Sequence, residues 1–215
     1  MKTSSTTSFF SAAEFRHRAL NQIGAPIEHA WRDHGDHILN PESLIEVEGL
    51  KLKDAAVLVP VVDDGDDDAK VILTQRTMKL RKHSGQIAFP GGGIDETDIS
   101  PEVAALREAQ EEIGLDPAYV ETVGRLPQYL SGTGFRIIPV LSVVRRGFVL
   151  EPNPHEVDSV FEVPLSFLMD PANHQLDSRD WQGILRHFYV MPYGERYIWG
   201  ITAGIIRTLY ERLYA

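Results

Sequence analysis

The chain has 215 residues, 43% of them hydrophobic and 24% charged, which predicts a soluble globular protein with a sizeable core. It contains no cysteine, and this excludes disulfides and zinc sites built on thiolates. The net charge of −10 argues against a duplex-DNA binder. No apolar run approaches the roughly 18 residues of a membrane span, and the N-terminus is a poor match to a signal peptide. A cytoplasmic protein is therefore expected.

The N-terminal quarter of the chain carries one predicted helix. Apolar residues recur at near-helical spacing over residues 11–23. Residues 25–52 show no clear period and contain two prolines. We therefore interpret residues 1–50 as an N-terminal extension packed on one domain that spans residues 51–215.

Two apolar runs and a glycine run follow. Residues 55–62 predict a buried strand and residues 71–74 its return strand. The acidic segment 63–68 between them predicts a solvated turn, because it lacks the alternating ligands and terminal Glu of an EF-hand loop. A short strand is then expected at 87–89, and it leads directly into the glycines of 91–93.

The clearest helix signal lies at residues 100–113. Ser100 is a predicted N-cap, and Pro101 occupies the first helical position. Glu102 suits the positive end of the helix dipole. Gly114 stands where a left-handed C-terminal cap is expected.

The remaining chain is predicted to be rich in strands. Strands are expected at about 119–125, 135–145, 157–163 and 185–192, a short helix or turn at 164–169, and an amphipathic helix at 201–214. This order lacks the regular βαβ alternation of a doubly wound sheet. It favours an α/β or α+β sandwich with mixed strands.

Three glutamates share one side of the helix at 100–113. Because residues three or four apart lie on one helical face, Glu108, Glu111 and Glu112 present their carboxylates together, and their repulsion would destabilise an isolated helix. A bound divalent cation would remove that repulsion, and oxygen-only ligands suit Mg²⁺ or Mn²⁺. The alternative is a solvated acidic face held by surface ion pairs. The preceding strand, the glycine turn and Asp98 favour the metal site.

The segment 92–115 resembles a Nudix box. The family pattern is Gly, five residues, Glu, seven residues, then Arg-Glu-apolar-x-Glu-Glu-x-Gly-apolar. The second half matches over residues 107–115 if Ala109 counts as the small apolar residue. Asp98 stands where Glu is usual, and eight residues separate it from Arg107.

The segment before the box is similar to the signature of the coenzyme A pyrophosphatase branch of the Nudix superfamily. The residues that carry this likeness are Leu73, Thr74, Arg76, Thr77, Arg81, Gly85 and the run Phe89-Pro90-Gly91-Gly92. Thr77 stands where Ser or Ala is usual. Further likeness lies at 131–135, 156–157 and 197–203, and that branch also tends to carry the extra residue and the Asp in its box. The resemblance covers about residues 55–212.

The resemblance implies a Nudix α/β/α sandwich with a mixed sheet. It also implies hydrolysis of coenzyme A, or a derivative, to 4′-phosphopantetheine and adenosine 3′,5′-bisphosphate with Mg²⁺ or Mn²⁺. Three alternatives stay open: a pyrophosphatase for ADP-ribose or another nucleoside diphosphate derivative, a sanitiser of mutagenic nucleotides, and a non-catalytic Nudix-like nucleotide-binding module. The three retained glutamates favour an enzyme, and the segment before the box favours coenzyme A.

The resemblance also suggests roles for the acidic residues. Glu108 and Glu112, one helical turn apart, are the primary expected metal ligands, and Glu111 is the expected third ligand or the holder of a second ion. A backbone carbonyl within 91–93 is a further candidate. Arg107 is expected to orient a carboxylate of the box.

A general base and a substrate site are also expected. Glu156 is the candidate base, and the adjacent His155 is the alternative. Arg76 and Arg81 are expected to bind the 3′-phosphate or the diphosphate, since guanidinium groups bind phosphate in a bidentate manner. The alternative is that one of them pairs with a carboxylate. The glycines at 91–92 are expected to let the backbone approach the substrate closely.

Two aromatic residues and the partners complete these expectations. Phe89 is expected in the core rather than on the adenine ring. Trp199 and the helix after it are interpreted as core or as the surface of a homodimer. The expected partner is a small nucleotide substrate, with neither DNA nor a membrane.

Overall fold

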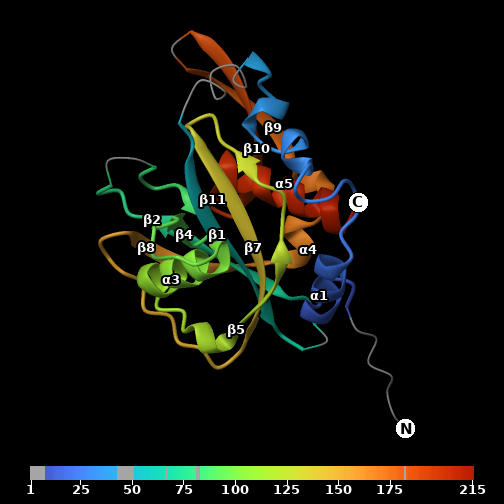
Figure 1. The fold of residues 1–215 in the computed structure, drawn as a ribbon, viewed down its shortest axis with the longest axis vertical. Coiled ribbons are helices and arrows are strands. Elements are labelled where there is room, and N and C mark those ends of the chain that lie inside the picture. Colours follow the sequence, from blue (N-terminus) through green and yellow to red (C-terminus); the bar gives the residue numbers. More distant parts are fainter. Residues whose placement is uncertain (1–7, 43–50, 66, 81–82, 182) are drawn as a thin grey trace.

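The computed structural model describes residues 8–42, 51–65, 67–80, 83–181 and 183–215. Its strands form an eight-stranded mixed sheet and a three-stranded antiparallel sheet. Figure 1 shows a helix on one side of the long central strands and the other main helices on the opposite side. The expected α/β/α sandwich with a mixed sheet is confirmed.

Two long parallel strands form the centre of the larger sheet. β1 (Lys53–Asp63) pairs with β7 (Phe135–Arg145) along its whole length. β2 (Lys70–Arg76) returns antiparallel to β1, β8 (Val157–Pro164) pairs with β2, and β5 (Val120–Arg125) pairs with β7. A strand covered on both faces needs a continuous apolar run. This explains the sequence AAVLVPVV within β1.

Three short strands complete the larger sheet. β3 (Ile87–Ala88) pairs with β2, and β6 (Tyr129–Leu130) pairs with β7. β4 (Gly91–Gly93) consists of the three glycines and pairs with β1 opposite residues 55–57. The glycine run is therefore part of the sheet, whereas the sequence predicted a turn there.

The two faces of the larger sheet pack against different helices. On one face α3 (Pro101–Ile113) covers β1 and β7, and Leu58 and Val140 belong to that apolar cluster. On the other face α5 (Ile201–Leu213) covers a cluster that contains Val59 and Leu141. Neighbouring residues of β1 thus point to opposite layers, as the period of a strand requires.

The N-terminal helix is part of the second layer. α1 (Ala12–Leu20) begins after the Ser11 N-cap and ends at Leu20, three residues earlier than predicted. It packs on β5, β1, β7 and α5. The guanidinium of Arg18 donates to the carbonyl oxygen of Leu213 at 2.8 Å.

The segment after α1 ties the two sheets together. The carboxylate of Asp36 accepts bonds from the Tyr129 hydroxyl and the Gly132 backbone N–H, both at 2.7 Å. The amide of Asn40 exchanges two hydrogen bonds with the backbone of His187, at 2.8 and 2.9 Å. Tyr129 and Gly132 belong to the β6–β7 region and His187 to the smaller sheet. The division of the chain near residue 50 stays a prediction, since residues 43–50 lie outside the described part.

The smaller sheet contains one expected strand and two that the sequence did not indicate. β10 (Ile184–Tyr193) lies between β9 (Gln175–Trp181) and β11 (Arg196–Trp199). Every residue of β9 is exposed, and its sequence QLDSRDW has no apolar alternation, so no pattern pointed to a strand. Figure 1 shows β9 and β10 rising above the main sheet.

The remaining elements are short. α4 (Leu165–Leu168) follows β8, as expected for that segment. The 3₁₀ helices occupy Ala30–Asp33, Asp36–Ile38, Pro117–Tyr119 and Pro171–Asn173. Among the described helices, none is long and apolar enough to cross a membrane.

An ion pair fixes the start of α3 against the sheet. Arg125 of β5 donates to both carboxylate oxygens of Glu102, in the first turn of α3. This contact with Arg125 lowers the pKa of Glu102 to about 2. The pair is partly exposed, so solvent screening limits what it contributes to stability.

Glu102→Gln should lower the free energy of unfolding at pH 7 by about 0.5 kcal/mol. The folded-state pKa of Glu102 is depressed, so its contribution is present above the unfolded value near 4.5 and is lost as the pH falls toward 2. Urea unfolding of the two proteins between pH 7 and pH 2 should therefore give stabilities that converge at low pH. Glu96→Gln, which removes an exposed carboxylate before the helix, should show no such convergence, and a pH-independent difference for Glu102→Gln would contradict the assignment.

Candidate metal and catalytic site

Both ends of α3 are capped as the sequence predicted. The Ser100 hydroxyl accepts the backbone N–H of Val103 at 3.3 Å, and Pro101 begins the helix. Gly114 ends it with φ = 69°. A Cβ at Gly114 would lie 2.9 Å from the backbone nitrogen of Glu151, so the glycine also allows another loop to approach.

That loop follows β7 and is held against the end of α3. The backbone N–H of Glu151 donates to the carbonyl of Ile113, and that of Asn153 donates to the carbonyl of Glu112, both at 2.9 Å. The Asn153 side chain reaches Glu156 Oε1 at 3.4 Å. Asn153 carries no signal in the sequence beyond its position three residues before a carboxylate, and it was not predicted as a site residue. The docked loop brings Glu156 close enough to affect the box carboxylates.

Glu112 is the most enclosed of the three box glutamates, with 3% of its side chain exposed. Its Oε2 accepts the Gly91 backbone N–H, and its Oε1 accepts Nη1 of Arg76, both at 3.1 Å. Burial raises the pKa of Glu112 to about 7, and the charges of Glu156 and Glu108 act in the same direction. Gly91 and Arg76 oppose that rise, because both stabilise the ionised form.

Glu108 lies one turn earlier and touches the glycine run. Burial is the main cause that raises its pKa, and Arg107 lowers it. A Cβ at Gly92 would lie 2.5 Å from the carboxyl carbon of Glu108, so this approach needs glycine. At Gly91, a Cβ would meet the Ala56 carbonyl oxygen at 2.4 Å, whereas Gly93 faces open space.

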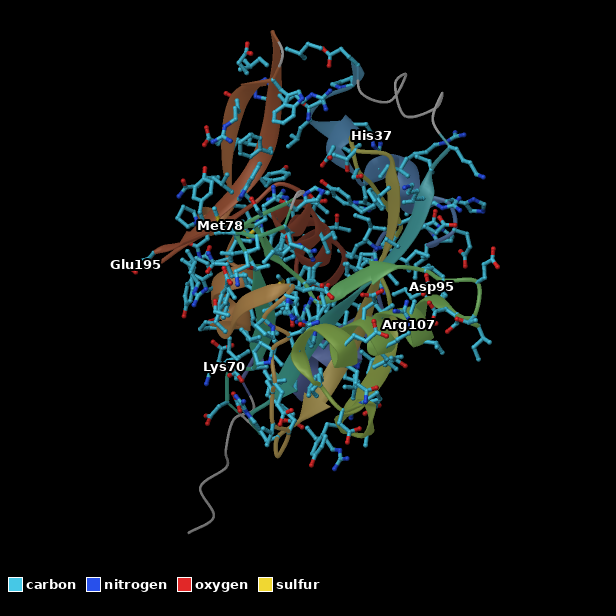
Figure 2. The ribbon with its side chains drawn as sticks, turned by 90° about the vertical axis from the view of Figure 1, so that its left-hand side faces the viewer. His37, Lys70, Met78, Asp95, Arg107 and Glu195 are labelled. Carbon is cyan, nitrogen blue, oxygen red and sulfur yellow. The ribbon has the colours of Figure 1, made fainter. Side chains whose placement is uncertain are left out.

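Arg107 gathers the acidic groups around the glycine run. It donates from Nε and Nη2 to the two oxygens of Asp98 at 3.2 and 2.9 Å, and from Nη1 to Glu108 at 2.9 Å. It also reaches Glu111 at 3.3 Å and the Gly93 carbonyl at 3.1 Å. Figure 2 shows Arg107 on the same side of the molecule as Asp95, in the loop after β4.

This geometry gives Asp98 and Glu111 distinct positions. Asp98 has 3% of its side chain exposed and binds the guanidinium of Arg107, which is the main cause of its lowered pKa. It therefore acts on Glu108 through Arg107. Glu111 has 57% of its side chain exposed and turns toward Arg107, at the edge of the cluster.

The enclosed carboxylates are suited to a divalent cation. Glu108, Glu112 and Glu156 are oxygen donors whose charges repel one another, and burial raises the pKa of the first two. A hard cation would relieve both costs. Within the described residues no three acidic or histidine side chains converge as a ligand set. Arg76 and Arg107 instead bind oxygens of Glu112 and Glu108. Glu108 and Glu112 are the residues that would hold the ion.

The other expected site residues fall in several places. Arg76 pairs with Glu112, and Arg81 lies outside the described residues. His155 is exposed in the loop that carries Glu156. Phe89 is buried, which confirms it as core. Trp199 packs against the Phe188 ring with centroids 5.3 Å apart, and the homodimer surface stays a prediction.

Comparison with known proteins gives consistent matches. A family model described as the NUDIX domain matches residues 52–183. The chain is similar to Nudix hydrolase 15, mitochondrial, of Arabidopsis thaliana, with 42% identity over 163 residues that cover 73% of this chain and 57% of that protein. It is also similar to the uncharacterized Nudix hydrolase NudL of Escherichia coli, with 40% identity over 173 residues that cover 80% of this chain and 88% of NudL. A solved Nudix hydrolase from Alicyclobacillus acidocaldarius aligns with 75% of this chain and 92% of its own, at 19% identity and a TM-score of 0.46.

Alanine at each of the three glycines should have a different effect. Gly92→Ala should weaken Mn²⁺ binding by about tenfold or more with little loss of stability, because its Cβ meets only the flexible end of Glu108. Gly91→Ala should destabilise the fold by about 2–4 kcal/mol, since its Cβ meets backbone. Gly93→Ala is the matched control and should change neither quantity.

Isothermal titration with Mn²⁺ and urea unfolding would measure both effects in all three variants. If Gly92→Ala and Gly93→Ala bound Mn²⁺ equally well, the close approach of Glu108 to the glycine run would have no part in holding the ion.

Proposed function

Because the chain belongs to the Nudix hydrolase family, we propose that it hydrolyses the diphosphate bond of coenzyme A or one of its derivatives. The products are 4′-phosphopantetheine and adenosine 3′,5′-bisphosphate. The observation that carries the proposal is the meeting of two motifs at one carboxylate. Arg76 and Gly91, from the segment that resembles the coenzyme A pyrophosphatase branch, both bind Glu112 of the Nudix box.

The cation requirement follows from the charge of the substrate. When bound, Mg²⁺ or Mn²⁺ neutralises the diphosphate, polarises a phosphoryl oxygen and lowers the pKa of a bound water. Glu108 and Glu112 would hold the ion. The Gly91 N–H fixes the carboxylate of Glu112, and Arg107, itself held by Asp98, fixes that of Glu108.

Glu156 is the residue that takes the proton from the attacking water. The charge of its carboxylate contributes to the raised pKa of both Glu108 and Glu112. The side-chain amide of Asn153 donates to its Oε1 and orients the carboxylate. A carboxylate beside the attacking water can accept its proton as a general base. His155 is the alternative base, but its side chain has no hydrogen-bond partner that would direct it among the described residues.

Two other functions share the same helix. A pyrophosphatase for ADP-ribose or another nucleoside diphosphate derivative would use the same carboxylates, so only the substrate distinguishes it. A non-catalytic nucleotide-binding module would not need the enclosed pair Glu108 and Glu112 beside Glu156. Retention of this costly carboxylate cluster favours an enzyme.

Product analysis by chromatography and mass spectrometry tests the substrate. Purified wild type should release adenosine 3′,5′-bisphosphate from coenzyme A with Mg²⁺ or Mn²⁺, with a higher kcat/KM than for ADP-ribose or a dinucleoside polyphosphate, and chelator should stop the reaction. Glu112→Gln should lower kcat/KM by about 10²–10³ through the weakened metal site, whereas Glu96→Gln should match wild type. Comparable turnover of ADP-ribose would overturn the coenzyme A assignment, and no turnover of any substrate would favour the binding module.

Arg81→Ala tests recognition of the 3′-phosphate. The variant should raise KM for coenzyme A by about tenfold and raise it much less for 3′-dephospho-coenzyme A, because the second substrate lacks the group that the guanidinium binds. Steady-state kinetics with both substrates measures the difference. An equal rise for the two would exclude a contact between Arg81 and the 3′-phosphate.

A further inference from the structure

A single side-chain hydrogen bond holds the guanidinium of Arg76 in the site, among the described residues. It is the last residue of β2, and its Nη1 donates to Glu112 Oε1 at 3.1 Å. Its Nε is buried and has no hydrogen-bond partner in the described part of the chain. Buried donors of this kind are normally paired, so the guanidinium in this arrangement leaves part of its bonding capacity unused.

The partner of Arg76 is also the residue proposed to hold the metal ion. Of the two carboxylate oxygens of Glu112, Oε2 accepts the Gly91 N–H and Oε1 accepts Arg76. A divalent cation at Glu112 would meet the positive guanidinium at contact distance, where like charges repel strongly. The cation and the present position of Arg76 therefore compete for one carboxylate.

The same contact explains how the negative charge of the enclosed Glu112 is stabilised when no metal ion is bound. Glu112 is enclosed beside Glu108 and Glu156, and an unpaired charge in such a place is strongly destabilising. Arg76 supplies the opposite charge from within the chain. It occupies the electrostatic position that a bound cation would take.

The position of Arg76 also allows its side chain to leave. About a quarter (24%) of the side chain is exposed, so its end reaches the solvent side of the site. The pairing of β2 with β8 becomes irregular between Gln75 and Arg76, where the regular ladder ends. Within the described part of the chain, one hydrogen bond to one carboxylate oxygen holds the guanidinium.

We propose that Arg76 exchanges partners: it neutralises Glu112 when no metal ion is bound, and it turns to the diphosphate of the substrate when the ion takes Glu112. This inference rests on the proposed function and extends it, because it couples ion binding to substrate binding. The free protein binds the ion more weakly than its carboxylates alone would. The ion, once bound, releases a guanidinium that binds phosphate.

The test measures two binding constants and no turnover. Mn²⁺ is titrated into wild type, Arg76→Gln and Arg76→Lys, and the Mn²⁺-loaded proteins are then titrated with methylenediphosphonate, a diphosphate analogue that cannot be hydrolysed at its bridge. Arg76→Gln should bind Mn²⁺ about 5- to 50-fold more tightly than wild type and should bind methylenediphosphonate more weakly by a similar factor. Arg76→Lys keeps the positive charge and should stay closer to wild type in both constants.

Arg125→Ala is the matched control, because it also removes an arginine–glutamate pair from α3 but lies outside the site. It should leave both constants unchanged. Weaker Mn²⁺ binding by Arg76→Gln, or unchanged binding of methylenediphosphonate, would overturn the exchange. If the wild type did not bind Mn²⁺ at all, the proposed metal site would be overturned as well. A protein that passes this test but fails to cleave coenzyme A would keep the exchange and lose only the proposed substrate.

Discussion

When Glu112 is ionised, its charge lies in a place where water barely reaches, and this imposes conditions on three separate elements. An uncompensated buried charge costs several kcal/mol, so groups from the protein have to surround it. α3 supplies the carboxylate, β4 supplies the Gly91 N–H and β2 supplies the guanidinium of Arg76. The register of the sheet and the position of the helix are therefore linked through this one side chain.

The glycine run shows how local geometry serves this arrangement. Each of its three residues does something different: Gly91 passes close to the backbone of β1, Gly92 leaves room for the carboxylate of Glu108, and Gly93 offers its carbonyl to Arg107. A side chain at either of the first two would push the helix or its carboxylates away from the strand. The missing side chains of these glycines thus allow both the close packing of α3 on the sheet and the position of its carboxylates.

Much of this fold could be predicted from the sequence, and the exceptions have physical reasons. The long strands β1 and β7 and the helix α3 were predicted because apolar period and caps are local signals. β4 was missed because glycines carry no strand pattern, and β9 because both of its faces are exposed. The carboxylates of the box were recognised from their helical spacing, the strand and glycines before the helix, and the resemblance to the Nudix box. The pairing of Arg76 with Glu112 was not predictable in that way, since it joins residues 36 positions apart on different elements.

The two helices that close the second layer lie outside the region matched by the family model. That match ends at residue 183, whereas α5 begins at Ile201, and it starts at residue 52, well after α1. Without them, the apolar face that contains Val59 and Leu141 would lose the cover that α1 and α5 give it. The stretch that defines the family by sequence is consequently not a transferable module. Recombination that moved it alone into another protein would leave behind the two helices that pack on this apolar face.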